Sequence, residues 1–243
     1  MIIVNADDWG RTRRETNAAL ACFRERRITS VTAMVFMEDS ARAADLARQE
    51  RIDVGLHLNL SQPFTQERLP GRLREYHERI CRYLNGSKYA MAVYNPVLRN
   101  SFRAVYRAQA DEFFRLYGRL PSHVDGHHHH HLCANMLWDD IYDEGLKVRR
   151  NFSFRPGEKS MANRMYRRLA DRCLGRRCRM TDYFYALSQH LPAERLGWLA
   201  DLAKTATVEL MSHPANDKEY TCLMSDGYQA LMAGVEKGTY TQL

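Results

Sequence analysis

Short apolar runs alternate with amphipathic segments along most of this chain of 243 residues. The first run, "MIIVNA", is apolar until its polar end, which is typical of a parallel strand buried on both faces. "TRRETNAALACFRERR" follows with apolar residues at helical spacing and a basic last turn, and predicts an amphipathic helix. The order then repeats, because "ITSVTAMVF" predicts a strand, "SARAADLARQER" a helix and "IDVGLHLNLS" an alternating strand.

The later part of the chain continues this order after a less regular stretch. Residues 62–95 contain Pro63, Pro70, Gly71 and Asn-Gly-Ser at 85–87, so we expect an irregular, lid-like insertion there. Further helices are expected at about 98–117, 134–145, 160–172, 193–204 and 226–237, and strands at the start of "SHVDGHHHHH" and in "LKVRRN", "MTDYFYAL" and "TVELMSHP". Strand-then-helix units without a break in composition predict a single domain over 1–243 with a parallel sheet, either barrelled or open.

The composition is that of an ordinary globular protein, with 45% hydrophobic and 10% aromatic residues. No apolar run approaches the ~18 residues that span a bilayer, so we expect no transmembrane segment. The N-terminus has no basic leader and no small-residue cleavage site, and we expect a cytoplasmic protein. The six cysteines form no framework and are expected to be reduced, since the spacing of Cys173 and Cys178 finds no second pair nearby for zinc.

The net charge of +7 is concentrated between Lys147 and Arg179, where twelve basic residues face two acids, Glu158 and Asp171. We favour a solvated helix face for this basic segment, 147–179. The alternative is attraction to a polyanion, or to an anionic substrate such as a phosphorylated or lipid-linked sugar. No aromatic residues are interleaved there at a regular strand spacing, so no nucleic-acid partner is expected.

Polar side chains recur where the predicted strands end. In parallel α/β folds the C-terminal ends of the strands open onto one face, so these sequence-distant residues are expected to converge there. They are Asn5, Asp7 and Asp8 on the first strand, His57 and Asn59 on the third, His123, Asp125 and His127 on the fourth, and His213 on the last.

Adjacent Asp7 and Asp8 point in opposite directions on an extended backbone, so one is free to bind a cation while the other handles a proton. The alternative is that Asp8 caps the following helix and Asp7 only turns the chain. His57 taken alone is typical of a core histidine, and it becomes a ligand candidate because other ligand types should reach the same face. His213 suits a general acid or base, or else a structural turn.

The run "HVDGHHHHH" places His123, Asp125 and His127 on one side of an extended segment, and Gly126 allows a turn. Five consecutive histidines cannot all coordinate one ion, because mononuclear sites take three or four protein ligands. Most of them must therefore support other ligands, face substrate or lie on the surface. Asp125 is suited to fix the tautomer of a ligating imidazole.

Five motifs then occur in order: "VNADDWG", "VGLHLNL", "HVDGHHHHH", "TDYFYAL" and "ELMSHPA". Together they resemble the motifs of the YdjC-like carbohydrate deacetylases, a family that includes chitooligosaccharide deacetylases and hopanoid-associated proteins. The resemblance covers residues 1 to about 216. It implies a distorted (β/α) TIM-like barrel related to polysaccharide deacetylases, and one divalent metal ion, zinc or magnesium. It also implies hydrolysis of an N-acetyl group from a sugar or glycoconjugate, which gives acetate and a free amine.

The resemblance also implies roles for individual residues. Asp8, His57 and His127 match the metal ligands, Asp7 matches the catalytic base and His213 the general acid. Residues that would support the ligands or bind substrate are His123, Asp125, His129, His131, Trp9, Asn59 and Tyr185, with Trp9 and Tyr185 suited either to stack on a sugar ring or, as we favour, to pack in the core.

Two departures from the family pattern stand out: Trp9 replaces the usual Phe, and His130 fills a slot that is commonly apolar. Two alternatives to deacetylation stay open. In the first alternative, the same site belongs to a hydrolase of another amide or ester. In the second, the protein is not catalytic and binds a metal or a polyanion, with the basic segment as its binding surface. A homodimer is also left open as the oligomeric state.

Overall fold

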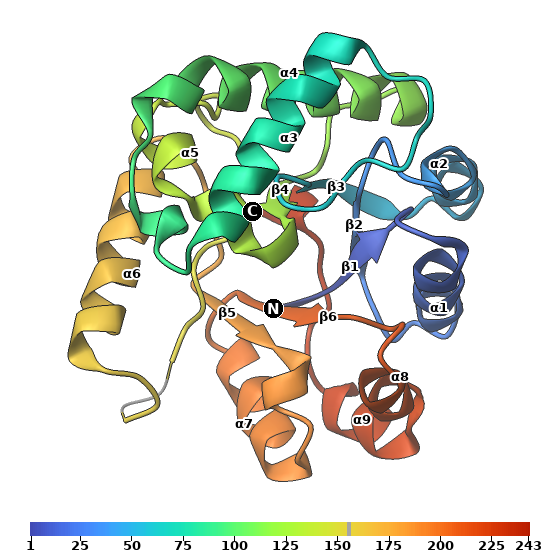
Figure 1. The fold of residues 1–243 in the computed structure, drawn as a ribbon. Helices are drawn as coiled ribbons and strands as arrows, with labels where there is room; N and C mark the ends of the chain where they lie inside the picture. The colour runs from blue at the N-terminus through green and yellow to red at the C-terminus, as the bar shows by residue number, and fades with distance from the viewer. Residues whose placement is uncertain (155–156) are drawn as a thin grey trace.

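The computed structural model describes residues 1–154 and 157–243. Six parallel strands form one sheet in the order β4-β3-β2-β1-β6-β5, curled so that helices surround it (Figure 1). The strands are β1 (Ile2–Trp9), β2 (Ser30–Ala33), β3 (Asp53–Leu58), β4 (Val124–Gly126), β5 (Tyr183–Ala186) and β6 (Val208–Ser212). The predicted parallel α/β fold is confirmed as a curled half-barrel.

The barrel is incomplete between its edge strands, β4 and β5. The segment predicted as the strand "LKVRRN" runs through this gap, but its backbone pairs with each neighbour at one residue only. Val148 bridges to Val124 of β4, and Lys147 bridges to Arg179. The prediction of a full strand is therefore wrong here, although the segment does occupy the position of a barrel strand.

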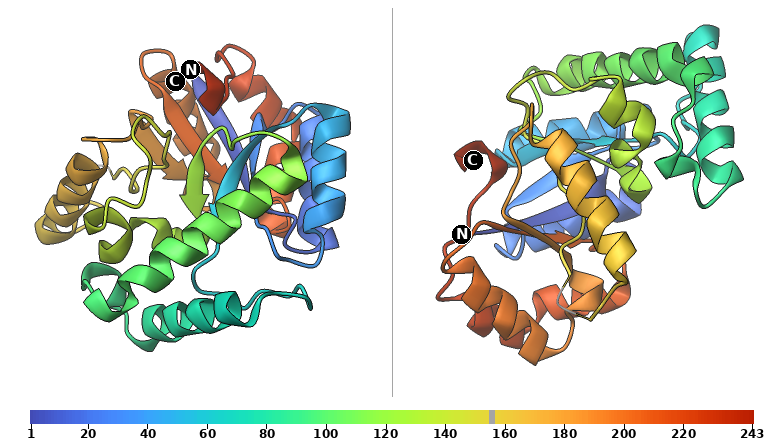
Figure 2. Two further views of the ribbon diagram at one scale, coloured as in Figure 1. Left: turned by 90° about the horizontal axis from the view of Figure 1, so that it is seen from above. Right: turned by 90° about the vertical axis from the view of Figure 1, so that its left-hand side faces the viewer.

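Helices cover the outside of the curled sheet in all three views (Figures 1 and 2). They are α1 (Arg13–Arg24), α2 (Ser40–Glu50), α3 (Gly71–Gly86), α4 (Arg99–Tyr117), α5 (Ala134–Trp138), α6 (Met161–Leu174), α7 (Ala193–Ala203), α8 (Asp217–Met224) and α9 (Asp226–Met232), with 3-10 turns η1 (Ala90–Ala92), η2 (Pro96–Leu98), η3 (His127–Leu132), η4 (Leu187–Gln189) and η5 (Tyr240–Gln242). Side-chain caps define several starts, since Thr12 accepts a hydrogen bond from the N–H of Arg14 before α1, and Asn216 caps α8 in the same way.

The expectation of an irregular stretch at 62–95 is wrong for its central part. Residues Gly71–Gly86 form α3, whose buried side chains His77, Ile80 and Leu84 follow helical spacing. Pro70 precedes this helix and the Asn-Gly-Ser sequence forms its C-terminal end, so neither interrupts it. Two other predicted helices are shorter than expected, ending at Trp138 and Met232, and α8 was not predicted.

The core lies on both faces of the central strands. All eight residues of β1 are buried, as its apolar run predicts. Gly55 of β3 packs directly on the ring of His123, and an added Cβ would lie 2.5 Å from that ring. Among the described residues, no helix is long and apolar enough to cross a membrane.

Candidate active site

Asp7 and Asp8 are adjacent near the end of β1, but the backbone there departs from the extended geometry of a strand. Asp8 has a φ of 66°, and the pairing register of β1 with β2 shifts between Ala6 and Trp9. This break in the extended geometry lets both carboxylates approach the ring of His57. Asp8 turns towards His57 and His127, whereas Asp7 turns towards Arg149. The two carboxylates therefore face different partners, although they are adjacent in the sequence.

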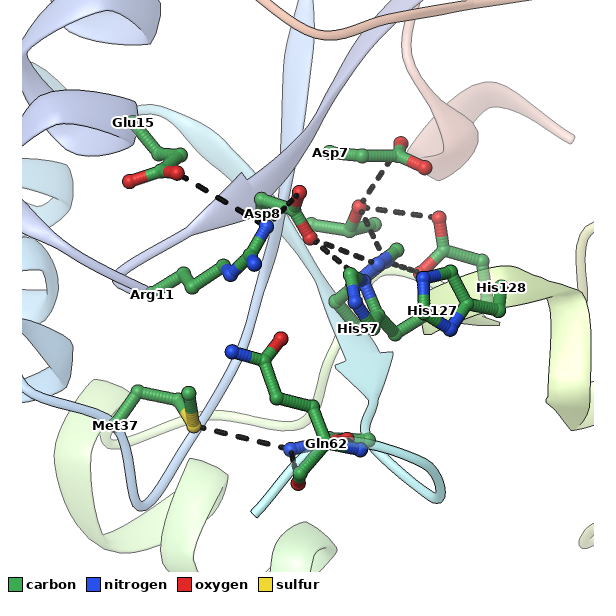
Figure 3. Close-up of polar contacts among 12 residues, drawn as sticks. Asp7, Asp8, Arg11, Glu15, Met37, His57, Gln62, His127 and His128 are labelled. Carbon is green, nitrogen blue, oxygen red and sulfur yellow. Dashed lines mark hydrogen bonds and ion pairs between the residues drawn. The ribbon is translucent and has the colours of Figure 1, made fainter. Parts of the chain in front are cut away.

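Asp8, His57 and His127 meet at one point, as predicted (Figure 3). The Oδ1 atom of Asp8 lies 3.4 Å from Nε2 of His57 and 3.0 Å from Nδ1 of His127. All three potential ligand atoms lie within 4.8 Å of one another, and all three residues are buried. Oδ1 has no hydrogen-bond partner among the described residues, whereas Oδ2 accepts a hydrogen bond from Arg11 at 3.2 Å.

Asp125 fixes the orientation of His57 from the other side. The Nδ1–H of His57 donates to Oδ1 of Asp125 at 2.7 Å, which directs Nε2 towards Asp8. Burial alone would lower the pKa of His57, but Asp125 and the neighbouring carboxylates raise it to about 10. The pocket around this ring therefore carries an excess of negative charge and favours a cation.

This donor set fits a divalent metal ion. One carboxylate oxygen, from Asp8, and two imidazole nitrogens converge, and that oxygen is buried without a hydrogen-bond partner in the described part of the chain. A second carboxylate, that of Asp125, holds the imidazole of His57 from the opposite side. Three protein ligands leave positions open for water and substrate, which is typical of catalytic sites. The same set suits zinc and tolerates magnesium.

Arg149 is a central residue of the site that no sequence pattern predicted. Its side chain is 0% exposed, and it donates to both carboxylate oxygens of Asp7 at 2.7 Å and to Glu209 at 2.7 Å. It also lies 2.6 Å from Asp125. Burial alone would raise the pKa of Asp7, but the Arg149 guanidinium holds it well below its usual range. The basic segment concealed this residue, because its many basic side chains favoured the prediction of a solvated helix face.

Glu209 and Tyr240 complete the wall behind Arg149. Both are fully buried, and the hydroxyl of Tyr240 donates to Glu209. Burial raises the pKa of Glu209 to about 7, although Arg149 acts in the opposite direction. The ring of Tyr240 also stacks on His123 at 3.6 Å between centroids. The chain thus uses a residue close to its C-terminus to shield this cluster.

His213 follows β6 at the rim of the site. Its side chain is 39% exposed, and its backbone N–H donates to Glu219 of α8 at 2.8 Å. Burial alone would lower the pKa of His213, but Glu219, whose carboxylate lies 3.8 Å from Nδ1, together with Asp7 and Asp8 raises it. Because its pKa is raised and its side chain is partly exposed, the imidazole of His213 is suited to donate a proton beside the aspartates.

The five histidines point in different directions because the backbone is left-handed at His128 and His129. His127 faces Asp8, and His128 hydrogen-bonds with Ser61 at 3.1 Å. His129 packs against Phe152 and Phe184. His131 donates to the backbone carbonyl of Arg149 at 3.1 Å, while His130 lies buried against His128. The five-histidine run therefore provides one of the three converging residues, His127, and its other histidines make contacts that support the site.

Four further predicted site residues lie in the interior. Trp9 is 0% exposed and donates to the carbonyl of Ala43, and Tyr185 is buried beside Trp198, so core packing, the favoured alternative, describes both. His123 is fully buried, and Asn59 organises the turn after β3 by bonding to Gln62. These four side chains shape the surroundings of the site instead of lining its opening.

A family model described as "YdjC-like protein" matches residues 1–239. The chain belongs to the YdjC-like protein family. Named relatives include a "Carbohydrate deacetylase" of Danio rerio, 33% identical over 56% of this chain and 43% of that protein. A "Chitooligosaccharide deacetylase" of Proteus mirabilis is 32% identical over 56% of this chain and 52% of that protein. These two matches span about half of each relative. A "Carbohydrate deacetylase" of Mus musculus is 30% identical over 88% of this chain and 77% of that protein.

A solved structure from Enterococcus faecalis V583, of a protein named for cellobiose-phosphate cleavage, has the same fold as this YdjC-like chain. The two superpose with a TM-score of 0.70 over 99% of this chain and 97% of the other, at 18% sequence identity. At this identity the likeness concerns the fold alone. It supports the incomplete parallel barrel described above.

Proposed function

We propose that this YdjC-like protein is a metal-dependent hydrolase that removes an N-acetyl group from an N-acetylated sugar or glycoconjugate. The observation that carries the proposal is the convergence of Asp8, His57 and His127 beside a second aspartate, Asp7, which takes no part in that set. The named relatives add support, since three of them are called carbohydrate or chitooligosaccharide deacetylases.

In this proposal Asp8, His57 and His127 hold one divalent ion, zinc or magnesium. When bound, the ion lowers the pKa of water and polarises a carbonyl group, which makes amide hydrolysis accessible at neutral pH. Asp125 keeps the Nε2 lone pair of His57 directed into the site. Arg11 holds the outer oxygen of Asp8, so its inner oxygen is free for the ion.

Asp7 is the proposed general base. Arg149 holds both of its oxygens and keeps it ionised, so it is ready to accept a proton from the attacking water. The two parallel hydrogen bonds also fix its orientation, which a single contact would not do. Asp7 therefore acts as a positioned proton acceptor instead of a ligand.

His213 is the proposed general acid. Its raised pKa favours the protonated imidazole, and its exposed edge allows contact with a bound sugar amide. It would donate a proton to the departing amine nitrogen, which is a poor leaving group without one. The products are acetate and a free amino sugar.

The test is acetate release from a panel of N-acetylglucosamine compounds, with and without EDTA and with added zinc or magnesium. We expect release that EDTA abolishes and one of the metals restores. The panel also includes O-acetyl sugars and amino-acid amides, so that a hydrolase of another bond is detected. Absence of release from every compound under every metal condition would exclude the proposed reaction.

We also propose a cytoplasmic location. All six cysteines have free thiols in the structure, which suits a reducing compartment. Fractionation of cells that express the tagged chain tests this proposal, and recovery in a secreted fraction would contradict it.

A further inference from the structure

Helix α6 presents an apolar stripe to solvent. Met161, Met165 and Leu169 are 84%, 60% and 54% exposed. They stand four residues apart, so they lie on one side of the helix. Scattered exposed apolar residues are common on proteins, but three in one helical stripe form a continuous patch. Figure 1 shows α6 at the left border of the molecule, and the right-hand view of Figure 2 shows it in front.

The opposite side of α6 already holds the helix on the protein. Ala170 and Leu174 are 7% and 3% exposed and face the interior. The single acid of the helix, Asp171, accepts hydrogen bonds from Arg150 and Asn151. The outer apolar stripe is therefore not needed to pack α6 against the rest of the protein. No acid of this helix offsets the positive charge on the outer side.

Arginines frame the apolar stripe. Arg168 and Arg172 are exposed and lie beside Met161 and Met165 on the same side of the helix. Arg168 also forms part of the rim of a neighbouring cavity of about 170 Å³ between α6 and residues 150–154. Arginine and aromatic side chains predominate in its lining, which also includes two aspartates and a serine: Arg150, Phe152, Ser153, Phe154, Arg164, Arg167, Arg168, Asp171, Asp182 and Tyr183.

Within this cavity the guanidinium of Arg167 lies over the rings of Phe152 and Phe154, at 5.9 and 5.1 Å from their centroids. Phe152 also contacts His129, at 4.6 Å between ring centroids. The cavity therefore combines an excess of arginine over aspartate with aromatic walls, and Phe152 connects it to His129 of the five-histidine run.

We propose that the outer face of α6, formed by Met161, Met165, Leu169, Arg168 and Arg172, docks on the surface of a bilayer that contains anionic phospholipids. Helices that lie in the membrane interface pair exposed apolar side chains with arginine or lysine. The apolar residues enter the acyl boundary, while the arginines attract anionic headgroups. This inference is independent of the proposed reaction, because none of these residues belongs to the candidate active site.

Two other occupants fit the face less well. A nucleic acid would use the arginines but would leave the methionines and the leucine in water. A second copy of the chain in a twofold contact would bring the Arg168 and Arg172 side chains of both copies into one interface, with no acid of α6 on that face to offset them. An anionic bilayer satisfies both the charge and the apolar stripe.

The test is flotation of the full chain with phosphatidylcholine vesicles, with and without phosphatidylglycerol. We expect binding only when phosphatidylglycerol is present, and weaker binding at high salt. The variant Arg168→Glu/Arg172→Glu should lower the partition coefficient at least about tenfold, since each arginine near the surface contributes about 1 kcal/mol. The variant Met161→Ser/Met165→Ser should also lower it, because the apolar contact is lost.

Matched control variants test whether vesicle binding depends on this face of α6 or only on the overall charge and the exposed apolar area of the protein. Lys88→Glu/Arg107→Glu changes the net charge equally at exposed positions elsewhere. Val97→Ser/Leu120→Ser changes side chains that are 82% and 77% exposed. Both controls should bind vesicles like the parent chain, and circular dichroism should show all variants folded.

Three results would overturn the inference. Equal loss of binding in the control variants would assign the attraction to overall charge. Unchanged binding by Met161→Ser/Met165→Ser would show that the apolar stripe does not enter the bilayer. A change in oligomeric state of the α6 variants by light scattering, without any vesicle binding by the parent, would assign the face to contact between copies.

Discussion

Arg149 holds both carboxylate oxygens of Asp7 through hydrogen bonds of 2.7 Å, in a region where the two side chains are 0% and 3% exposed. The pair joins the first strand to the irregular segment that fills the gap in the barrel. Because water is nearly excluded, the contact fixes both the charge and the direction of the carboxylate. It also makes the fold dependent on this arginine, since Asp125 and Glu209 share the same guanidinium.

Replacement of Arg149 should therefore affect stability as well as activity. Arg149→Ala leaves buried carboxylates without a counter-charge, and we expect a loss of about 3–5 kcal/mol in the free energy of unfolding. Arg149→Lys keeps the charge but not the two parallel hydrogen bonds, so its loss should be smaller. Urea unfolding measures both. Arg176→Ala, at an exposed position of the same basic segment, is the control and should change stability by less than about 0.5 kcal/mol.

Replacing each of the two adjacent aspartates alone should have a different effect. Asp8→Asn should lose bound metal, because it weakens the only carboxylate of the proposed ligand set. Asp7→Asn should retain the metal and lower turnover by about 10²–10⁴-fold, the usual contribution of a general base. Metal content after dialysis and acetate release provide the two measurements. Equal loss of metal in both variants would contradict the assigned division of roles.

The close packing of Gly55 on His123 predicts a steric effect in the core. An alanine at this position would place Cβ 2.5 Å from the imidazole, which also stacks on the Tyr240 ring and is fully buried. Gly55→Ala should therefore cost about 1–3 kcal/mol in thermal or urea unfolding. Gly71→Ala is the matched control, because an added Cβ meets nothing within 4 Å there. Similar stability of both variants would refute the packing argument.

Glu209 should make stability depend on pH. Its pKa in the folded chain is raised from 4.5 to about 7, so between these values the folded state binds more protons than the unfolded state. The free energy of unfolding should accordingly fall as the pH rises through this interval, by about 3 kcal/mol from this group alone.

Urea unfolding of the parent chain and Glu209→Gln at pH 5 and pH 7 tests this. The variant has no proton to lose, so its decrease over the interval should be smaller than that of the parent. Parallel curves for the two proteins would show that Glu209 does not titrate in this range. The absolute stability of the variant does not enter the comparison, because only the pH-dependent difference is used.

Much of the arrangement was predictable from the chain because it depends on local pattern. Apolar runs predicted the buried strands, and the direction of parallel strands predicted that polar side chains at the strand ends would converge. The structure brings Asp8, His57 and His127, the set that the family resemblance implied, within reach of one another there. The roles of these residues stay proposals. The helix at 71–86 was missed because Pro70, Gly71 and Asn-Gly-Ser suggested a break, although they stand at its two ends.

The amino-acid sequence by itself determined most of the alternation of strands and helices, the family, and the convergence of polar residues at the ends of the strands. Only the tertiary structure decided that Arg149 belongs to the site while Arg168 and Arg172 lie at the surface. All three occupy the same basic segment, and their chemistry is identical. Their difference arises because Asp7, Asp125 and Glu209 come from three separate strands and meet at one guanidinium, a proximity that spacing along the chain does not encode.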